Sequence, residues 1–245
     1  MSTHTLLIMK IRNSLAFEAI KAAIASPKNK DFPLIEVEFP PLEALNKLGD
    51  GSLRSAIEVD TANLAFASKL IGSLAPLPFM GPKVWLLASS AASSSFLKTA
   101  KKSVGSAQLF SLRDGLPQVT TGDVCILLSP SSRNDYESAQ RIASDGIAKA
   151  VVIVNGFAKD ERSIPAKATM AYFLKPLTYN SQVVGYLTRA YPGKWVTIDA
   201  LTKQILSSKD DVEILVPKTN TPDLRASGKL VQKSVDERAI KARRG

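Results

Sequence analysis

Short apolar runs alternate with amphipathic stretches over the first two thirds of the chain. The run at 150–154 (Ala-Val-Val-Ile-Val) has no polar position, and the run at 124–128 is almost as apolar. Strands of this kind are typical of a parallel sheet that is covered on both faces. By the same criterion of periodicity, we expect further strands at 34–39, 83–88 and 108–112. We expect a first helix at 14–26, capped by Ser14, and a second from its cap Asp60 to about Gly72. Two more helices should run from Ser89 to about Ser103 and from Asn134, which has Glu137 at capping-box spacing, to Gly146.

The rhythm changes after Asn155. Strand-like segments then follow one another without a helix between them, and Pro176, Asn180 and Pro192-Gly193 separate them as turns. These segments lie at 170–174, 183–188 and 195–198, with a last strand expected at 212–216. From Pro222 a polar helix, with Val231, Val235 and Ala239 on one side, runs to the end of the chain.

This order of elements predicts an α/β fold. Strands and helices that alternate at these lengths form right-handed βαβ units. We therefore expect a three-layer sandwich with a mostly parallel sheet, extended by an antiparallel C-terminal meander. Residues 1–220 are predicted to form a single α/β domain, and residues 221–245 a basic C-terminal helix or tail.

Charge is concentrated at the two ends of the chain. The net charge is +10, of which residues 1–30 contribute +4 and residues 225–245 contribute +5, so the middle of the chain is almost neutral. Basic arms of this kind bind anionic lipid, RNA or an acidic patch on a partner protein, or serve only as solvated tails. The C-terminal cations are Lys229, Lys233, Arg238, Lys241, Arg243 and Arg244.

Several kinds of catalytic site are excluded by count. The chain has one histidine, His4, and one cysteine, Cys125, which lies in an apolar run and is expected in the core. Ser–His–Asp and Cys–His systems and zinc sites are therefore not expected, and neither the P-loop nor the dinucleotide fingerprint occurs. Glu36 and Glu38 share one face of a strand and are expected in solvent. We expect no catalytic residue, no metal and no cofactor, and no apolar run is long enough to cross a bilayer.

Polar residues at the ends of the predicted strands are candidates for binding. The loop at 129–134 leads into a helix, where hydroxyls, a guanidinium and backbone N–H groups can bind an anion. The same residues also suit a plain helix cap and turn. The candidates here are Asp60, Asn63, Ser131, Ser132, Arg133, Asn134 and Asn155.

The segment 185–195 is the most distinctive in the chain. Arg189, Tyr191 and Trp195 surround the turn at Pro192-Gly193. An aromatic and arginine-rich surface of this kind is typical of protein interfaces. The alternative is a hairpin whose aromatic side chains pack on the sheet.

The same segment resembles the R-x-Y-P-G-x-W signature of a plastid and cyanobacterial domain-of-unknown-function family that includes the Low Photosystem II Accumulation proteins. The resemblance spans most of residues 14–200 and fades in the C-terminal tail. It implies a stromal protein, soluble or loosely held at thylakoids, without an established enzymatic activity. Further segments agree in order: 36–41, Asp60 and Asn63, 154–156, and 172–176.

Two functions are carried forward as hypotheses. The first is a non-enzymatic stromal accessory or assembly factor, or a stable partner, for thylakoid photosynthetic complexes, peripheral to the membrane. Its partners would be proteins of these complexes at their stromal face, with a weak contact to anionic lipid. The alternative is a phosphate- or nucleotide-binding enzyme or sensor that uses the strand-end loops; a related domain appended to a plastid adenylate kinase keeps this reading open. Binding to nucleic acid is not expected, because the middle of the chain is neutral.

Overall fold

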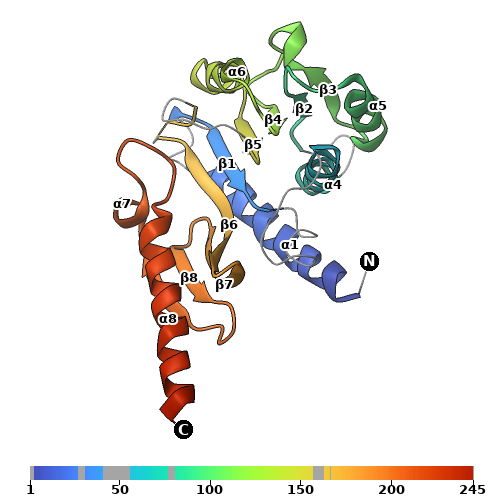
Figure 1. Ribbon diagram of the computed structural model, residues 1–245. Helices are drawn as coiled ribbons and strands as arrows, with labels where there is room; N and C mark the ends of the chain where they lie inside the picture. Colours follow the sequence, from blue (N-terminus) through green and yellow to red (C-terminus); the bar gives the residue numbers. More distant parts are fainter. Residues whose placement is uncertain are drawn as a thin grey trace.

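The computed structural model describes residues 3–26, 31–40, 56–76, 81–156, 163–165 and 167–244, without the side chains of 3–10, 56–57 and 244. Nine strands form one sheet in the order β3-β2-β4-β5-β1-β6-β7-β8-β9 (Figure 1). The strands are β1 (Leu34–Glu38), β2 (Val84–Ala88), β3 (Gln108–Ser111), β4 (Val124–Leu128), β5 (Ala150–Val154), β6 (Thr169–Tyr179), β7 (Gln182–Ala190), β8 (Trp195–Asp199) and β9 (Ile205–Lys209).

The sheet has a parallel part and an antiparallel part. All pairs from β3 across to β6 are parallel, and β6 to β9 form an antiparallel meander. The α/β fold with a mostly parallel sheet and a C-terminal antiparallel extension is thus confirmed.

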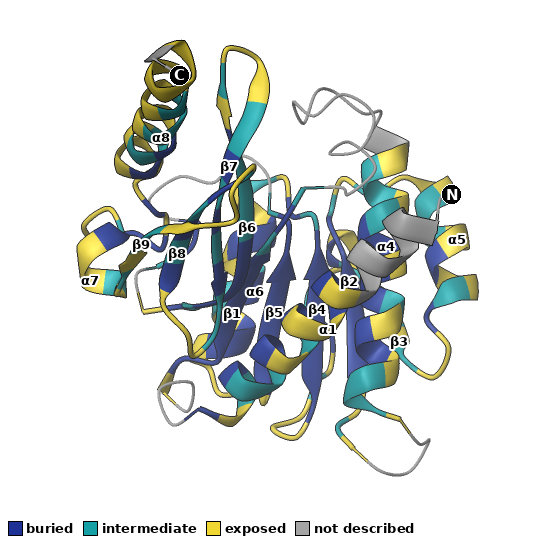
Figure 2. Cartoon of the chain, turned by 90° about the horizontal axis from the view of Figure 1, so that it is seen from below, coloured by how far each residue is buried: buried dark blue, intermediate teal, exposed yellow. Residues whose placement is uncertain are grey.

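Helices cover both faces of this sheet. The residues of β4 and β5 are all buried, as a two-sided sheet requires (Figure 2). On one face lie α1 (Thr3–Ala25), α4 (Ala56–Leu74) and α5 (Ser94–Ser103), which share a core with Val37, Leu86 and Ile126. On the other face α6 (Arg133–Ser144) packs on Leu87 and Leu127. α7 (Asp211–Ile214) and α8 (Leu224–Arg244) cover the antiparallel part, where Val231 joins a core with Leu187 and Trp195. None of the described helices is long and apolar enough to cross a membrane.

Four helix starts differ from the prediction. α1 begins at Thr3 rather than at Ser14, and α4 begins at Ala56, so that Asp60 lies inside the helix and does not cap it. α5 begins at Ser94 with Ser93 as its cap, because Ser89 is held by another partner, described below. α6 is capped by Ser132, whose hydroxyl accepts from the Asp135 N–H. The capping box is therefore Ser132–Asp135, two residues earlier than the predicted Asn134–Glu137.

The prediction of a strand at 212–216 is wrong. Residues Asp211–Ile214 form the short helix α7, and the last strand is β9, which is earlier in the chain. The Asp210 N–H donates to the Glu213 carboxylate (2.8 Å), which stabilises the start of a helical turn. Of the apolar residues in this segment, Ile214 is buried, whereas Val212 and Val216 are exposed, so the alternating burial of a strand is absent here.

Glu36 is also not where the sequence pattern placed it. Its side chain is buried, because β1 lies between β5 and β6 and helices cover both faces at this point. Asn220 Nδ2, from the segment before α8, donates to Glu36 Oε2 at 3.0 Å. This bond joins the C-terminal segment to the centre of the sheet.

Candidate functional site

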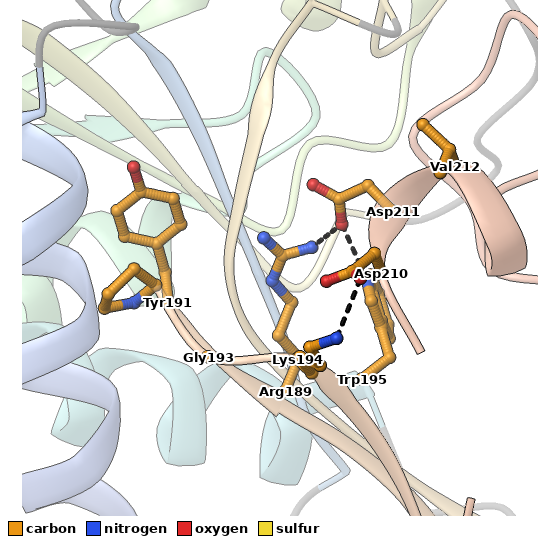
Figure 3. A pocket seen from close by; sticks show the side chains of 9 residues that line it. Arg189, Tyr191, Gly193, Lys194, Trp195, Asp210, Asp211 and Val212 are labelled. Atoms are coloured by element: carbon orange, nitrogen blue, oxygen red, sulfur yellow. Dashed lines mark hydrogen bonds and ion pairs between the residues drawn. The ribbon is translucent and has the colours of Figure 1, made fainter. Parts of the chain in front are cut away.

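A pocket of about 330 Å³ lies at the turn between β7 and β8, beside α7 (Figure 3). We call it the signature pocket, because six of the seven residues of the R-x-Y-P-G-x-W segment line it. Arg189 comes from the end of β7 and Trp195 from the start of β8, with the turn 191–194 between them. Asp210, Asp211 and Val212 close it from α7.

The turn requires its glycine. Gly193 N–H donates to the Ala190 carbonyl at 2.8 Å, and a Cβ on Gly193 would lie 2.8 Å from the same oxygen. Any other residue would push this carbonyl away. The peptide bond between Tyr191 and Pro192 is cis. Tyr191 lies on the side of α1, where its hydroxyl is 2.8 Å from Ser26 Oγ, and its ring centroid is 5.9 Å from the Arg189 guanidinium carbon (Figure 3).

Arg189 is the innermost charge of the pocket. The residue is 6% exposed, and its guanidinium carbon lies 5.2 Å from the centroid of the Trp195 ring. Its Nη1 donates to Asp211 Oδ1, which also accepts from Trp195 Nε1–H at 2.7 Å. Burial lowers the pKa of Arg189, while the charges of Tyr191 and Asp210 raise it in part. The guanidinium is thus held between an aromatic ring and a fixed carboxylate.

One donor of this guanidinium is unsatisfied. Among the described residues, Arg189 Nε is buried without a hydrogen-bond partner. A buried donor of a charged group that lacks an acceptor costs roughly 1–3 kcal/mol. Such a donor marks a place where an acceptor from another molecule adds stability, provided that the surrounding side chains move to admit it.

The rim of the pocket is partly ionic and partly apolar. Lys194 Nζ donates to Asp210 Oδ2 at 2.8 Å, and this bond raises the pKa of Lys194. Both side chains are more than half exposed, so the pair is readily opened. Val212 is 93% exposed beside them. The rim therefore combines an ion pair that opens readily with an exposed apolar side chain, above a buried arginine and tryptophan.

The strand-end candidates form a separate cluster at the carboxyl ends of β4 and β5. Asn155 Nδ2 donates to Asn63 Oδ1, and Asn63 Nδ2 donates to Ser129 Oγ, both at 2.7 Å. The Phe39 N–H donates to Asn155 Oδ1 at 2.8 Å. Asn155 and Ser129 both have positive φ (50° and 46°), so the two side chains are set by these turns. Asn63 and Asn155 therefore lie together, as the sequence suggested, and they tie three loops to one another.

The backbone N–H groups near the start of α6 already donate to a side chain of the same helix. Asp135 is fully buried, and its carboxylate accepts from Ser89 Oγ (2.7 Å), from Ser90 N–H (2.8 Å) and from the N–H groups of Ser131 and Ser132 (3.2 and 3.3 Å). Burial raises the pKa of Asp135, but these bonds outweigh it and the pKa lies below its usual value. The backbone donors expected to bind an external anion thus already bind Asp135.

The remaining candidates of this loop point elsewhere. Arg133 Nε donates to Glu137 at 2.6 Å along the surface of α6, and Asn134 is exposed. Asp60 lies apart from them on α4 and lines a different pocket together with Ser131. Burial raises the pKa of Asp60.

A family model described as "Domain of unknown function (DUF1995)" matches residues 14–207. The chain belongs to the DUF1995 family. No curated protein and no solved structure matches it. The DUF1995 match includes Arg189, Tyr191 and Trp195 but ends inside β9. Asp210, Asp211 and all of α8, which complete the pocket and cover the antiparallel strands, lie beyond the matched range.

The C-terminal cations differ in their surroundings. Lys229, Lys233, Lys241 and Arg243 are exposed, and Lys233 lies 3.9 Å from Glu237. Arg238 instead binds the buried carboxylate of Asp199, and the side chain of Arg244 lies outside the described part of the chain. Five of the six predicted tail residues thus have described side chains, and one of these five serves the fold.

Sequence reasoning missed the aspartates on which these sites depend. Asp211 fixes Arg189, Asp135 fills the start of α6, and Asp199 anchors α8. Only Asp135 had a usable signal, because it follows Ser132 at capping-box spacing. The side-chain partners of Asp199 and Asp211 are 16 to 39 residues away in the sequence, at separations that no local pattern reveals.

Proposed function

We propose that this DUF1995 protein is a non-enzymatic accessory or assembly factor for photosynthetic complexes, peripheral to the stromal face of the thylakoid in plastids. In this proposal it acts by binding a partner protein at the signature pocket. The observation that carries the proposal is that residues of the R-x-Y-P-G-x-W segment converge on one pocket with an exposed apolar rim. The plastid and thylakoid setting is supported by the resemblance of this segment to the family of the Low Photosystem II Accumulation proteins.

The pocket offers a partner three kinds of contact. Val212 and the Pro192 ring present apolar surface, which a partner's apolar side chain would cover. Arg189 and Trp195 form a rigid inner wall, because Asp211 holds both. A carbonyl or carboxylate oxygen of the partner would accept from Arg189 Nε, and Lys194 can turn from Asp210 toward the same oxygen.

Val212→Glu tests this proposal with little risk to the fold, because the side chain is 93% exposed. Leu201→Glu is the matched control: Leu201 is 74% exposed in the turn between β8 and β9 and does not line the pocket. Both variants and the wild type serve as baits in a mild-detergent pull-down from plastid extract. A buried charge in a hot spot costs several kcal/mol, so we expect roughly 100-fold weaker binding for Val212→Glu.

The expected result is that wild type and Leu201→Glu recover photosystem subunits or assembly intermediates, whereas Val212→Glu does not. Equal recovery by all three baits would reject the pocket as the binding site. Recovery of no photosynthetic protein by the wild type would reject the proposed function itself.

A further inference from the structure

A second pocket, of about 200 Å³, lies between the carboxyl ends of β2 and β4. The chain leaves β2 through α5 toward β3 at one edge of the sheet, and it leaves β4 through α6 toward β5 in the opposite direction. The two helices lie on opposite faces. In open α/β sheets, ligands bind where adjacent connections diverge in this way. We call this second cavity the switch-point pocket.

The switch-point pocket is negatively charged. Asp60 lines it from α4, and within the described part of the chain its carboxylate has neither a hydrogen bond nor an ion pair. Asp135 lies behind Ser89, which lines the pocket and donates to this second carboxylate. No lysine, arginine or histidine is among the described lining residues.

Arg113, in the turn after β3, is directed at the backbone of the loop that follows β2. Arg113 donates through Nε to the Ser90 carbonyl and through Nη2 to the Ala92 carbonyl, both at 3.1 Å. It braces the loop after β2 and does not line the pocket. Among the described lining residues, Asp60 thus has no cation beside it, and burial raises its pKa.

A phosphate does not suit this environment. The N–H groups of Ser131 and Ser132 at the start of α6, which would be its donors, are directed at Asp135. A phosphate would have to displace a buried carboxylate and would then lie beside Asp60. A phosphate and a carboxylate that line the same pocket repel each other strongly where water is partly excluded.

The other walls provide one fixed hydroxyl and an apolar surface. Ser129 Oγ is held in place by Asn63 and keeps a second lone pair for another donor. Phe96 and Leu128 form an apolar side. The volume is below the 300–1,000 Å³ or so that is usual for drug-sized ligands, so the occupant is a small molecule.

We infer that the switch-point pocket binds a small organic ammonium compound. Its charged nitrogen pairs with Asp60 and donates to Ser129 Oγ, and its apolar part packs on Phe96 and Leu128. This inference does not depend on the signature pocket, which lies in the antiparallel part of the sheet, between β7, β8 and α7.

The test measures binding to the full chain by calorimetry and by the shift of the melting temperature. The probes are phenethylamine, putrescine and choline, with 2-phenylethanol as the neutral analogue and inorganic phosphate as the anion. Asp60→Asn removes the charge and keeps the shape, and Asp236→Asn, on the exposed side of α8, removes one carboxylate elsewhere. Ala91→Leu narrows the pocket without changing its charge, since Ala91 is an exposed lining residue.

We expect at least one ammonium probe to bind and to raise the melting temperature, with at least tenfold weaker binding to Asp60→Asn and to Ala91→Leu. Asp236→Asn should bind like the wild type. Three results would overturn the inference: no binding of any ammonium probe at millimolar concentration, equal binding to wild type and Asp60→Asn, or tighter binding of phosphate or of 2-phenylethanol than of the ammonium probes.

Discussion

Single aspartates organise this protein at the scale of residues. Asp135 and Asp199 are both fully buried, and each is stabilised mainly by several hydrogen-bond donors. Asp199 accepts from the N–H groups of Leu201 and Thr202, both at 2.9 Å, from Ser234 Oγ at 2.8 Å, and from Arg238. It therefore joins the turn after β8 to the middle of α8. If α8 leaves the sheet, the buried carboxylate loses two of its four donors, Ser234 and Arg238.

Asp199→Asn should lower the free energy of unfolding by about 2–4 kcal/mol, because it breaks a buried, charge-assisted network and turns an amide N–H₂ toward Arg238. Burial raises the pKa of Asp199, but the hydrogen bonds outweigh it and the net pKa is well below the unfolded value of about 3.9. The stabilisation is therefore present above that pH and is lost as the pH falls below about 4. Urea unfolding between pH 7 and pH 3 measures both effects, with the exposed Asp236→Asn as control. An unchanged pH dependence in Asp199→Asn would contradict this assignment.

At the scale of elements, the sequence was most informative where both faces are buried. The runs 124–128 and 150–154 coincide with β4 and β5, because a two-sided strand has no polar position to obscure it. It was least informative at the antiparallel edge. Among the described strands, β9 (Ile205–Lys209) pairs only with β8, and its half-polar pattern does not stand out. The stronger apolar pattern of 212–216 predicts a strand instead, but tertiary contacts of Asp211 hold that segment as a helix.

The packing of α8 on the sheet depends on a glycine in β7. A Cβ on Gly185 would overlap with Val231 Cγ1 and lie 2.7 Å from the Ile198 carbonyl oxygen. Gly185→Ala should therefore destabilise the protein by about 1–3 kcal/mol, the usual cost of overpacking. The second change Val231→Ala removes the side-chain part of this clash, so the double variant should lose less than the sum of the two single losses. Chemical denaturation of the four proteins gives this cycle.

Strict additivity in this cycle would mean that α8 does not pack on β7 as described. Gly228→Ala is a useful control, because it places the same methyl group on α8 itself, where a Cβ meets nothing within 4 Å. Alanine is the better helix former, so this variant should be neutral or slightly more stable.

At the scale of the whole molecule, the cations are arranged around a neutral sheet. α8 is anchored through Ser227, Val231 and Arg238, and beyond Arg238 its last turns extend past the sheet into solvent (Figure 1). Residues 239–243 are all exposed there. A rigid arm of this kind brings charge to a surface at a lower entropic cost than a disordered tail. The sequence predicted the charge of the tail, but the anchor that makes it rigid needs the distant partner Asp199.

This arrangement predicts weak, salt-sensitive binding to an anionic lipid surface. Lys229, Lys241 and Arg243 are exposed, and no hydrogen bond or ion pair to a described residue holds them. Each cation near an anionic membrane contributes about 1 kcal/mol, so the triple change of these residues to Gln should weaken binding on the order of 100-fold. Co-sedimentation with vesicles of mixed neutral and anionic lipid at low salt measures this effect. Raising the salt to about 1 M shortens the screening length to about 3 Å and should release the wild type as well.

The matched control removes the same charge from the other edge of the sheet. Lys98, Lys101 and Lys102 are exposed on α5, so their triple change to Gln lowers the net charge by the same three units without touching α8. If binding depends on the position of the cations, this variant should keep most of its affinity, whereas equal losses in both triple variants would show that only net charge matters. The circular dichroism of the α8 variant must remain that of the wild type, because cations in the last turn also stabilise the helix dipole. Loss of vesicle binding with an unchanged spectrum would then place the contact on the exposed cations of α8.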